Sequence, residues 1–270
     1  MAVSLVVTLL AAPATADEFG DGNARAHLVA STDNFETGGT FLLGVHLDIK
    51  PGWHIYWRNP GEAGVATEIR WHTPDGLRAG ALQWPLPIGF IQSGDIPGYG
   101  YEGSVVLAAE TWAGDGLGED SEVGATVSWL ACKDVCVIGS AELARALSKV
   151  SVDPVFSTWM NSLPQALGEE DPPFGLTTTG GLRQGKLSLW LQWRQTPQTV
   201  EWFPDPPDGL EVKDVTVRTR GGLTRIDAAV RTLKGATGVM TGLSSLVVAT
   251  NKDGSRHGWK LIVRLEDNEL

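Results

Sequence analysis

The chain has few of the residues that mark several classes of protein. Its 270 residues include only two cysteines, three methionines and three tyrosines. The 21 Lys and Arg are outnumbered by 32 Asp and Glu, giving a net charge of −11, and no run of basic residues occurs. Nucleic acids and anionic membrane surfaces both call for a basic face, so neither is expected as a partner. The few methionines also argue against a methionine-rich copper carrier.

Long apolar runs are missing as well. No segment approaches the roughly 20 apolar residues that a membrane-spanning helix needs. Residues 2–12 form a shorter apolar stretch, and Ala14-Thr15-Ala16 gives an A-x-A cleavage pattern before Asp17. The basic residues that usually precede such a stretch are absent, since the first Lys or Arg is Arg25. We predict a signal peptide over residues 1–16 and export to an oxidising compartment, with a buried N-terminal helix as the alternative.

Short β-strand patterns dominate the rest of the chain. Turn sequences rich in Pro, Asn, Asp and Gly separate them. Clear strand patterns cover residues 40–49, 105–109, 125–130, 186–193 and 259–265. Many short strands at this spacing predict an all-β sandwich or barrel rather than an α/β sheet.

The pattern changes at Asp153-Pro154, a good start for a short helix that runs to Leu163. A Pro- and acid-rich stretch follows at 168–173, after which strand patterns resume. We therefore predict a first domain over residues 17–152, a helix and Pro-rich linker over 153–175, and a second domain over 176–270.

A short internal repeat supports two related domains in tandem. A strand pattern leads into Pro-Asp-Gly-Leu at 74–77 and again at 207–210, about one domain length further on.

The two cysteines lie four positions apart, at Cys132 and Cys136. Four extended residues span roughly 13 Å, whereas a disulfide needs Cα atoms roughly 4.4–6.8 Å apart. The pair can therefore form a disulfide only if Lys133-Asp134-Val135 turns the chain. So small a loop stabilises a protein by only ~2 kcal/mol, which weakens the interpretation as a structural staple. Redox exchange, staple and metal ligation all remain open from spacing alone.

The sequence gives little support for a histidine metal site or for a sugar-binding site. The five histidines show no paired ligand spacing, and we predict no metal site and no cofactor; they are His27, His46, His54, His72 and His257. The aromatic segment from Trp53 to Trp57 could bind a sugar, but its alternation favours Trp53, Ile55 and Trp57 on a core face, with His54 and Tyr56 opposite.

Three motifs together resemble a known family. They are Gly-Trp-His-Ile-Tyr-Trp-Arg-Asn-Pro-Gly at 52–61, Tyr-Gly-Tyr-Glu-Gly at 99–103 and Trp-Leu-Ala-Cys-Lys-Asp-Val-Cys at 129–136. They are similar to the periplasmic N-terminal region of the DsbD-like protein-disulfide reductases, with the ScsB type, named for suppression of copper sensitivity, as the closest branch. One departure is Val137-Ile138-Gly139 after the second cysteine, where the family commonly has proline.

The resemblance implies immunoglobulin-like domains and site residues. Cys132 and Cys136 match the exchanging pair, and Cys136 is favoured as the attacking cysteine. Tyr99 and Tyr101 fall in the segment similar to the cap that shields the pair from stray oxidants. Asp95 and Glu102 are further candidates, for proton transfer near the thiols.

The resemblance also implies partners and a place in the cell. The chain is expected to be a periplasmic protein-disulfide reductase module that relays electrons from a transmembrane domain or subunit and a thioredoxin-fold donor. Expected clients are disulfide isomerases and thiol proteins of cytochrome c assembly, and copper tolerance is the associated trait. Tethering to the inner membrane through a missing C-terminal domain is also expected, with no turnover without the membrane partner.

Two other classes of function stay open. One is a copper-handling module with the thiols as soft ligands, and the other is a carbohydrate- or protein-binding sandwich with a structural disulfide.

Overall fold

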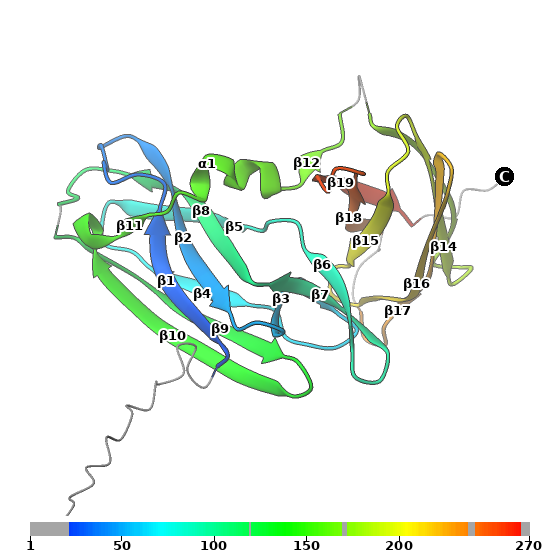
Figure 1. Cartoon of the computed structure of the whole chain (residues 1–270), viewed down its shortest axis with the longest axis horizontal. Helices are drawn as coiled ribbons and strands as arrows, with labels where there is room; N and C mark the ends of the chain where they lie inside the picture. Colours follow the sequence, from blue (N-terminus) through cyan, green and yellow to red (C-terminus); the bar gives the residue numbers. More distant parts are fainter. Residues whose placement is uncertain (1–21, 119, 169–171, 237–240, 266–270) are drawn as a thin grey trace, which may run out of the picture.

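The structure, a computed structural model, describes residues 22–118, 120–168, 172–236 and 241–265. The predicted signal peptide lies outside these residues. The described chain forms four β-sheets arranged as two pairs, which lie side by side along the long axis of the molecule (Figure 1). None of the helices in the described ranges is long and apolar enough to span a bilayer.

The first pair of sheets is built from the strands up to residue 152. One sheet has the order β11-β1-β2-β8-β5 and the other β10-β9-β3-β7-β6, with β4 also paired to β9. The strands are β1 (Ala24–Ala30), β2 (Thr40–Ile49), β3 (His54–Gly61), β4 (Glu68–His72), β5 (Leu77–Gln83), β6 (Ile88–Gln92), β7 (Ile96–Glu102), β8 (Ser104–Ala113), β9 (Glu122–Cys132), β10 (Cys136–Ala146) and β11 (Ser151–Val152).

The second pair of sheets follows after a short helical segment. Its orders are β12-β19-β18-β15 and β13-β14-β17-β16. The strands are β12 (Gln165–Ala166), β13 (Phe174–Gly181), β14 (Lys186–Trp193), β15 (Thr199–Asp205), β16 (Leu210–Arg220), β17 (Leu223–Thr232), β18 (Gly242–Thr250) and β19 (Arg256–Arg264). The predicted all-β fold of two tandem immunoglobulin-like sandwiches is confirmed.

Alternating side chains build the first core, as a half-buried strand requires. On β2, Leu43, Val45 and Leu47 are fully buried and face the other sheet, whose β9 contributes Val127 and Trp129. The intervening residues of β2 point to the outer face of the sandwich. This alternation determines which side chains of each strand are free to form a site.

The repeated Pro-Asp-Gly-Leu sequence forms the same turn in both halves. Leu77 donates its backbone N–H to Pro74, and Leu210 does so to Pro207, in both cases at 3.1 Å. The glycine of each turn has φ of +86°, a conformation that glycine adopts without a steric penalty. Each turn carries the chain from one sheet of its pair to the other, from β4 to β5 and from β15 to β16. The sequence repeat therefore corresponds to a structural repeat.

The helical segment covers part of the first sandwich. It comprises α1 (Phe156–Trp159) and a 3₁₀ turn, η2 (Met160–Ser162), close to the predicted helix; a second 3₁₀ turn, η1 (Leu147–Lys149), precedes β11. Trp159 packs on Val106 of β8 and donates its indole N–H to the carbonyl of that residue. This contact covers the outer face of the β11-β1-β2-β8-β5 sheet.

The two halves share part of one core. Phe203 on β15 is 1% exposed and belongs to the first core, where its ring packs edge-on against Trp57 and Tyr99. Polar contacts surround this ring: Arg58 pairs with Asp205 at 2.8 Å, and Asn59 donates to the carbonyl of Pro204. The second sandwich is thus packed directly against β3.

Candidate redox site

Cys132 and Cys136 are joined by a disulfide at the end of a hairpin. Cys132 closes β9, Cys136 opens β10, and the two residues are direct cross-strand partners with Cα atoms 4.1 Å apart. The three residues between them turn the chain, as the spacing requires, with the Lys133 N–H bonded to the Val135 carbonyl at 3.0 Å. The antiparallel ladder of β9 and β10 therefore holds the two sulfurs together without help from distant strands.

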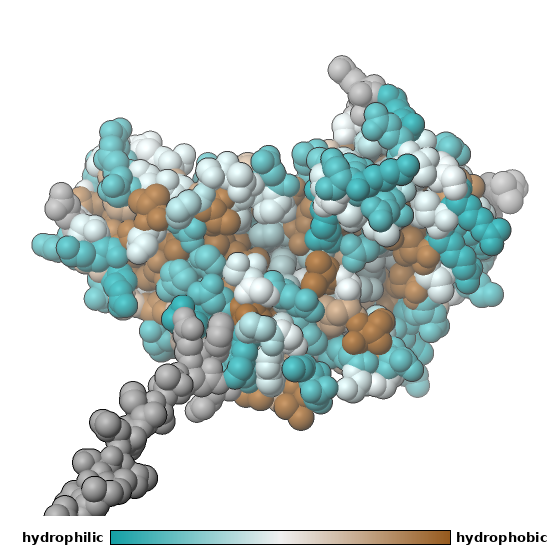
Figure 2. All heavy atoms as spheres, in the orientation of Figure 1, coloured by the Kyte–Doolittle hydropathy of each residue, from teal (hydrophilic) through white to brown (hydrophobic). Residues whose placement is uncertain are grey.

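The two cysteines differ in exposure. Cys132 is 1% exposed, whereas Cys136 lies on the surface. Beside Cys136, Val135 is 63% and Ile138 is 82% exposed. In Figure 2, hydrophobic residues reach the surface at the lower edge of the molecule, where the β9–β10 hairpin ends. An incoming thiolate can therefore reach the Cys136 sulfur across an apolar surface, while Cys132 is shielded.

A tyrosine contacts the buried sulfur. The Tyr56 hydroxyl lies 3.2 Å from Cys132 Sγ and 2.6 Å from Gln92 Oε1. The Gln92 amide nitrogen donates to the Ala63 carbonyl, which orients its oxygen toward the hydroxyl. A hydroxyl has one proton, so it serves these two acceptors in turn. Burial raises the pKa of Tyr56, which keeps it a neutral donor.

An imidazole and a phenyl ring lie beside Tyr56 and Cys132. His54 is the cross-strand partner of Cys132, and its ring packs on Phe90 with centroids 3.8 Å apart and the ring planes tilted by 37°. Burial lowers the pKa of His54 to about 4, and its Nε2 has no hydrogen-bond partner among the described residues. His54 is therefore neutral at neutral pH and supplies no positive charge to a thiolate.

Phe90 can pack on His54 because the cross-strand partner of Phe90 is a glycine. Gly98 on β7 faces Phe90 directly, and a Cβ at that position would lie 2.4 Å from the phenyl ring. Contacts that short do not occur between real atoms, so a side chain at this position would displace Phe90. The β6–β7 pairing thus brings an aromatic ring against His54 and Tyr56, the neighbours of Cys132.

The second sandwich anchors β6. Glu201 on β15 accepts the backbone N–H of Gly89 at 3.0 Å and pairs with Arg256 of β19 at 2.8 Å. Arg256 also donates to the carbonyl of Pro87 at 2.7 Å. These contacts flank Phe90 on its N-terminal side, so the position of the ring depends on both halves of the chain.

The two tyrosines predicted as a cap lie elsewhere. Tyr101 is paired with Ile55, and both point into the core, on the face opposite to Cys132 and His54. The Tyr101 hydroxyl donates to the buried carbonyl of Pro85, and Tyr99 packs on Phe203. The structure therefore does not bring Tyr99 or Tyr101 over the disulfide, because alternation turns them inward.

The two carboxylates predicted for proton transfer differ in placement. Glu102 is the partner of His54 on the side away from Cys132, so it lies on the same face, two strands from the sulfur. Asp95 occupies the exposed turn between β6 and β7, with φ of +59°. Of the two, only Glu102 lies in the same line of cross-strand partners as Cys132, with His54 between them. Proton transfer through either carboxylate stays a prediction.

Four residues of the pocket were absent from the predicted site: His54, Tyr56, Phe90 and Gln92. Alternation did predict correctly that His54 and Tyr56 face away from the core. The sequence signal that could have identified His54 and Tyr56 was that two polar side chains alternate with tryptophans and so share the outer face of the strand. Phe90 and Gln92 gave none, because their contact with β3 depends on the pairing of β6 with β7.

Comparisons with known proteins relate part of the sequence to a family and the whole fold to a solved structure. Residues 25–148 match the family described as thiol:disulfide interchange protein DsbD, N-terminal. The N-terminal periplasmic domain of ScsB from Proteus mirabilis has a similar structure, with a TM-score of 0.69 and 23% identity over 95% of this chain and 97% of that one. The major pilin subunit BcpA of Bacillus cereus, 10% identical over 91% of this chain and 67% of that one, has a TM-score of only 0.28, too low to relate the folds. The comparison with curated proteins gave no match.

The matched residues contain nine of the eleven strands of the first sandwich in full, all but the first residue of β1, and the disulfide hairpin. The fold of both sandwiches is that of the ScsB domain. The resemblance expected from the three sequence motifs is confirmed for residues 25–148, which carry the disulfide and match the DsbD N-terminal family.

Proposed function

We propose that this chain is a periplasmic thiol–disulfide exchange module that passes electrons between thioredoxin-fold proteins through Cys132 and Cys136. The observation that carries the proposal is the asymmetry of the disulfide: an exposed Cys136 is bonded to a buried Cys132 whose sulfur contacts the Tyr56 hydroxyl. Exchange requires a sulfur that an incoming thiolate can reach and a leaving sulfur whose thiolate is stabilised, and this arrangement offers both.

The exchange step follows from this geometry. A thiolate of a reduced donor attacks Cys136 Sγ, the disulfide breaks, and Cys132 leaves as a thiolate. The second thiolate of the donor then attacks the donor's first sulfur, which is bonded to Cys136 in the mixed disulfide. Cys136 leaves as a thiolate. Two electrons and two protons have moved from the donor dithiol to this chain, and the donor is left with a disulfide. In the reverse direction the Cys136 thiolate attacks a client disulfide and Cys132 resolves the mixed disulfide.

Tyr56 favours this order of events. Charge develops on Cys132 when the disulfide opens, and the hydroxyl 3.2 Å away can turn its proton from Gln92 to that sulfur. A hydrogen bond to a charged group contributes about 1.5–3 kcal/mol. Cys132 is therefore the better leaving group, and attack at Cys136 is favoured by both access and chemistry.

Partners are inferred by chemistry. The exposed Val135 and Ile138 beside Cys136 suit an apolar patch around a donor or client cysteine. In line with the family, we propose a thioredoxin-fold donor fed by a membrane-embedded domain, and periplasmic disulfide proteins as clients, with disulfide isomerases and thiol proteins of cytochrome c assembly as candidates. A role in copper tolerance is proposed on the same basis.

The reduction potential of the disulfide tests the proposal. The full chain is equilibrated in graded thiol buffers, and free cysteines are counted by mass-tagging. A value of roughly −180 to −270 mV, within reach of thioredoxin-like proteins, is expected. A value below roughly −300 mV would identify a structural disulfide and overturn the proposal.

Trapping of mixed disulfides provides a matched pair of variants. Cys132→Ser leaves the exposed Cys136 and should accumulate a mixed disulfide with an oxidised thioredoxin-fold protein. Cys136→Ser leaves only the buried Cys132 and should trap the same protein far more slowly. Equal trapping by both variants would contradict the assigned order of attack.

A further inference from the structure

A second cluster of reactive side chains lies on the opposite face of the first sandwich. His27 on β1 and His46 on β2 are direct cross-strand partners, and their ring centroids are 4.8 Å apart. Both point away from the core, on the outer face of the sheet that does not carry the cysteines. This cluster is therefore separated from the disulfide by the whole thickness of the sandwich.

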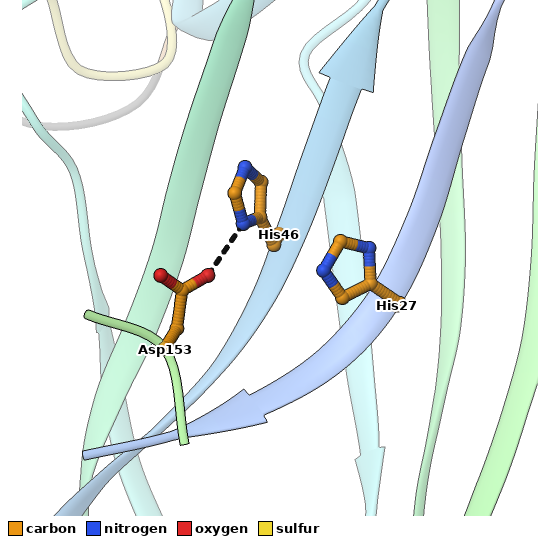
Figure 3. Close-up of side chains that lie close together, drawn as sticks. All are labelled: His27, His46 and Asp153. Carbon is orange, nitrogen blue, oxygen red and sulfur yellow. Dashed lines mark hydrogen bonds and ion pairs between the residues drawn. The ribbon is translucent and has the colours of Figure 1, made fainter. Parts of the chain in front are cut away.

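Asp153 joins the two histidines from a distant part of the chain. The parallel pairing of β11 with β1 brings it in, and its backbone N–H is bonded to Ala30 at 3.1 Å. Figure 3 shows its carboxylate pointing at His46, with Oδ2 2.6 Å from Nδ1. The other oxygen, Oδ1, accepts the Val155 N–H at 2.9 Å, which fixes the orientation of the carboxylate. In metal sites, hydrogen bonds of this kind to a ligand's other atoms hold the ligand in the orientation needed for binding.

The ligand atoms are close enough to share one ion. One atom each from His27, His46 and Asp153 lie within 4.8 Å of one another. Ligands of tetrahedral zinc at about 2.1 Å from the ion lie roughly 3.4 Å apart, so rotation of the two imidazoles closes the remaining gap. The ion would take the place of the His46–Asp153 hydrogen bond.

Asp48 adds negative charge beside the cluster, at the other ring nitrogen of His46 from Asp153. Its oxygens lie 3.5 Å from His46 Nε2 and 3.9 Å from His27 Nδ1, with Arg25 3.6 Å away on the other side. The cluster therefore offers two imidazoles and the Asp153 carboxylate as ligands, with the Asp48 carboxylate nearby. We propose that His27, His46 and Asp153, with Asp48 beside them, bind a divalent transition-metal ion of the zinc class. Imidazole nitrogen with carboxylate oxygen is the donor set that such ions accept.

The proposal differs from the plain structural role of these residues. A hydrogen bond between His46 and Asp153 alone would fasten the segment after β11 to the sheet. That role needs no His27, whereas a metal site does. The proposal also stands apart from the exchange function, because no cysteine takes part.

Calorimetric titration of the full, oxidised chain with ZnCl2 at pH 7.5 tests the site, since the disulfide keeps the thiols from binding zinc. One ion per chain is expected, with affinity lowered at least about tenfold in His27→Ala and in His46→Ala. MgCl2 should not compete, because magnesium prefers all-oxygen sites. His72→Ala is the matched control, since His72 lies on β4 in the other sheet and contacts Thr126.

Two further variants keep the result interpretable. His27 is partly exposed, so its replacement should leave the fold intact, which thermal unfolding without zinc checks. Asp153→Asn retains an oxygen for the Val155 N–H but loses the charge, and should also bind zinc more weakly. Absence of saturable binding to the wild-type chain, or equal affinity in His27→Ala, would overturn the proposal.

Discussion

At the scale of single residues, the Tyr56 hydroxyl is the group that can donate a hydrogen bond to the buried sulfur of Cys132. Tyr56→Phe keeps the ring and removes the hydrogen bond to Cys132. Loss of a hydrogen bond to a thiolate should raise the pKa of Cys132 in the reduced protein by about one unit and slow exchange several-fold. Thiolate absorbance against pH measures the first effect, and stopped-flow reduction by thioredoxin the second.

The comparison variant is Gln92→Leu, which removes the other acceptor of the same hydroxyl. With Gln92 gone, the proton of Tyr56 has only Cys132 to serve, so the pKa of Cys132 should fall or stay constant. A rise of similar size in both variants would mean that packing rather than the hydroxyl controls the thiol.

His54 makes the stability of the domain depend on pH. Burial lowers its pKa to about 4 from an ordinary 6.5, so between these values the unfolded chain binds the proton more readily than the folded one. The stabilisation is complete above pH 6.5 and is lost as the pH falls toward 4, by up to about 3 kcal/mol. Urea unfolding from pH 4 to 7 measures this slope. His54→Phe should flatten it, and an unchanged slope would assign the effect to other groups.

At the scale of elements, β6 carries Phe90, which packs on His54 and Tyr56, and the second sandwich holds β6 in place. Glu201→Ala removes the acceptor of the Gly89 N–H and the partner of Arg256. The Gly89 amide should then exchange its hydrogen faster, and Cys132 in the reduced protein should be alkylated faster as Phe90 moves. Hydrogen-exchange mass spectrometry and timed alkylation provide the two readouts.

Asp205→Asn is the control at the same interface. It weakens the Arg58–Asp205 ion pair, which joins β3 to β15 rather than to β6. Alkylation of Cys132 should stay at the wild-type rate in this variant. If both variants accelerate alkylation equally, the interface acts by general loosening and not through β6.

At the scale of the whole molecule, the first core is completed by the second sandwich. Phe203→Ala removes a buried ring from between Trp57 and Tyr99, and such truncations cost about 3–5 kcal/mol. The loss should appear as faster hydrogen exchange in β3, in the other half of the chain. Phe174→Ala, in the second core against Trp193, should destabilise the second half and leave β3 protected. Protection of β3 in both variants would mean that the halves are energetically independent.

The sequence-based predictions failed where a side chain's neighbours depend on how the strands pair. Tyr99 and Tyr101 were expected over the disulfide because they lie in a segment resembling the family cap. They point into the core because Tyr101 pairs with Ile55, and a shift of register by one residue would have reversed their direction. The histidines were judged scattered for the same reason, since His27 and His46 become neighbours only when β1 pairs with β2.

The sequence by itself determined the features that depend on local chemistry. Alternating apolar residues predict an all-β fold, the Pro-Asp-Gly-Leu turns predict its repeat, and two cysteines four positions apart permit a disulfide if the residues between them turn. Only the tertiary structure decided that Cys132 is buried and Cys136 exposed, and that Tyr56, Phe90 and the second sandwich form the pocket. Those contacts join residues far apart in the chain, and their free energy depends on the pairing of whole strands, which no local pattern encodes.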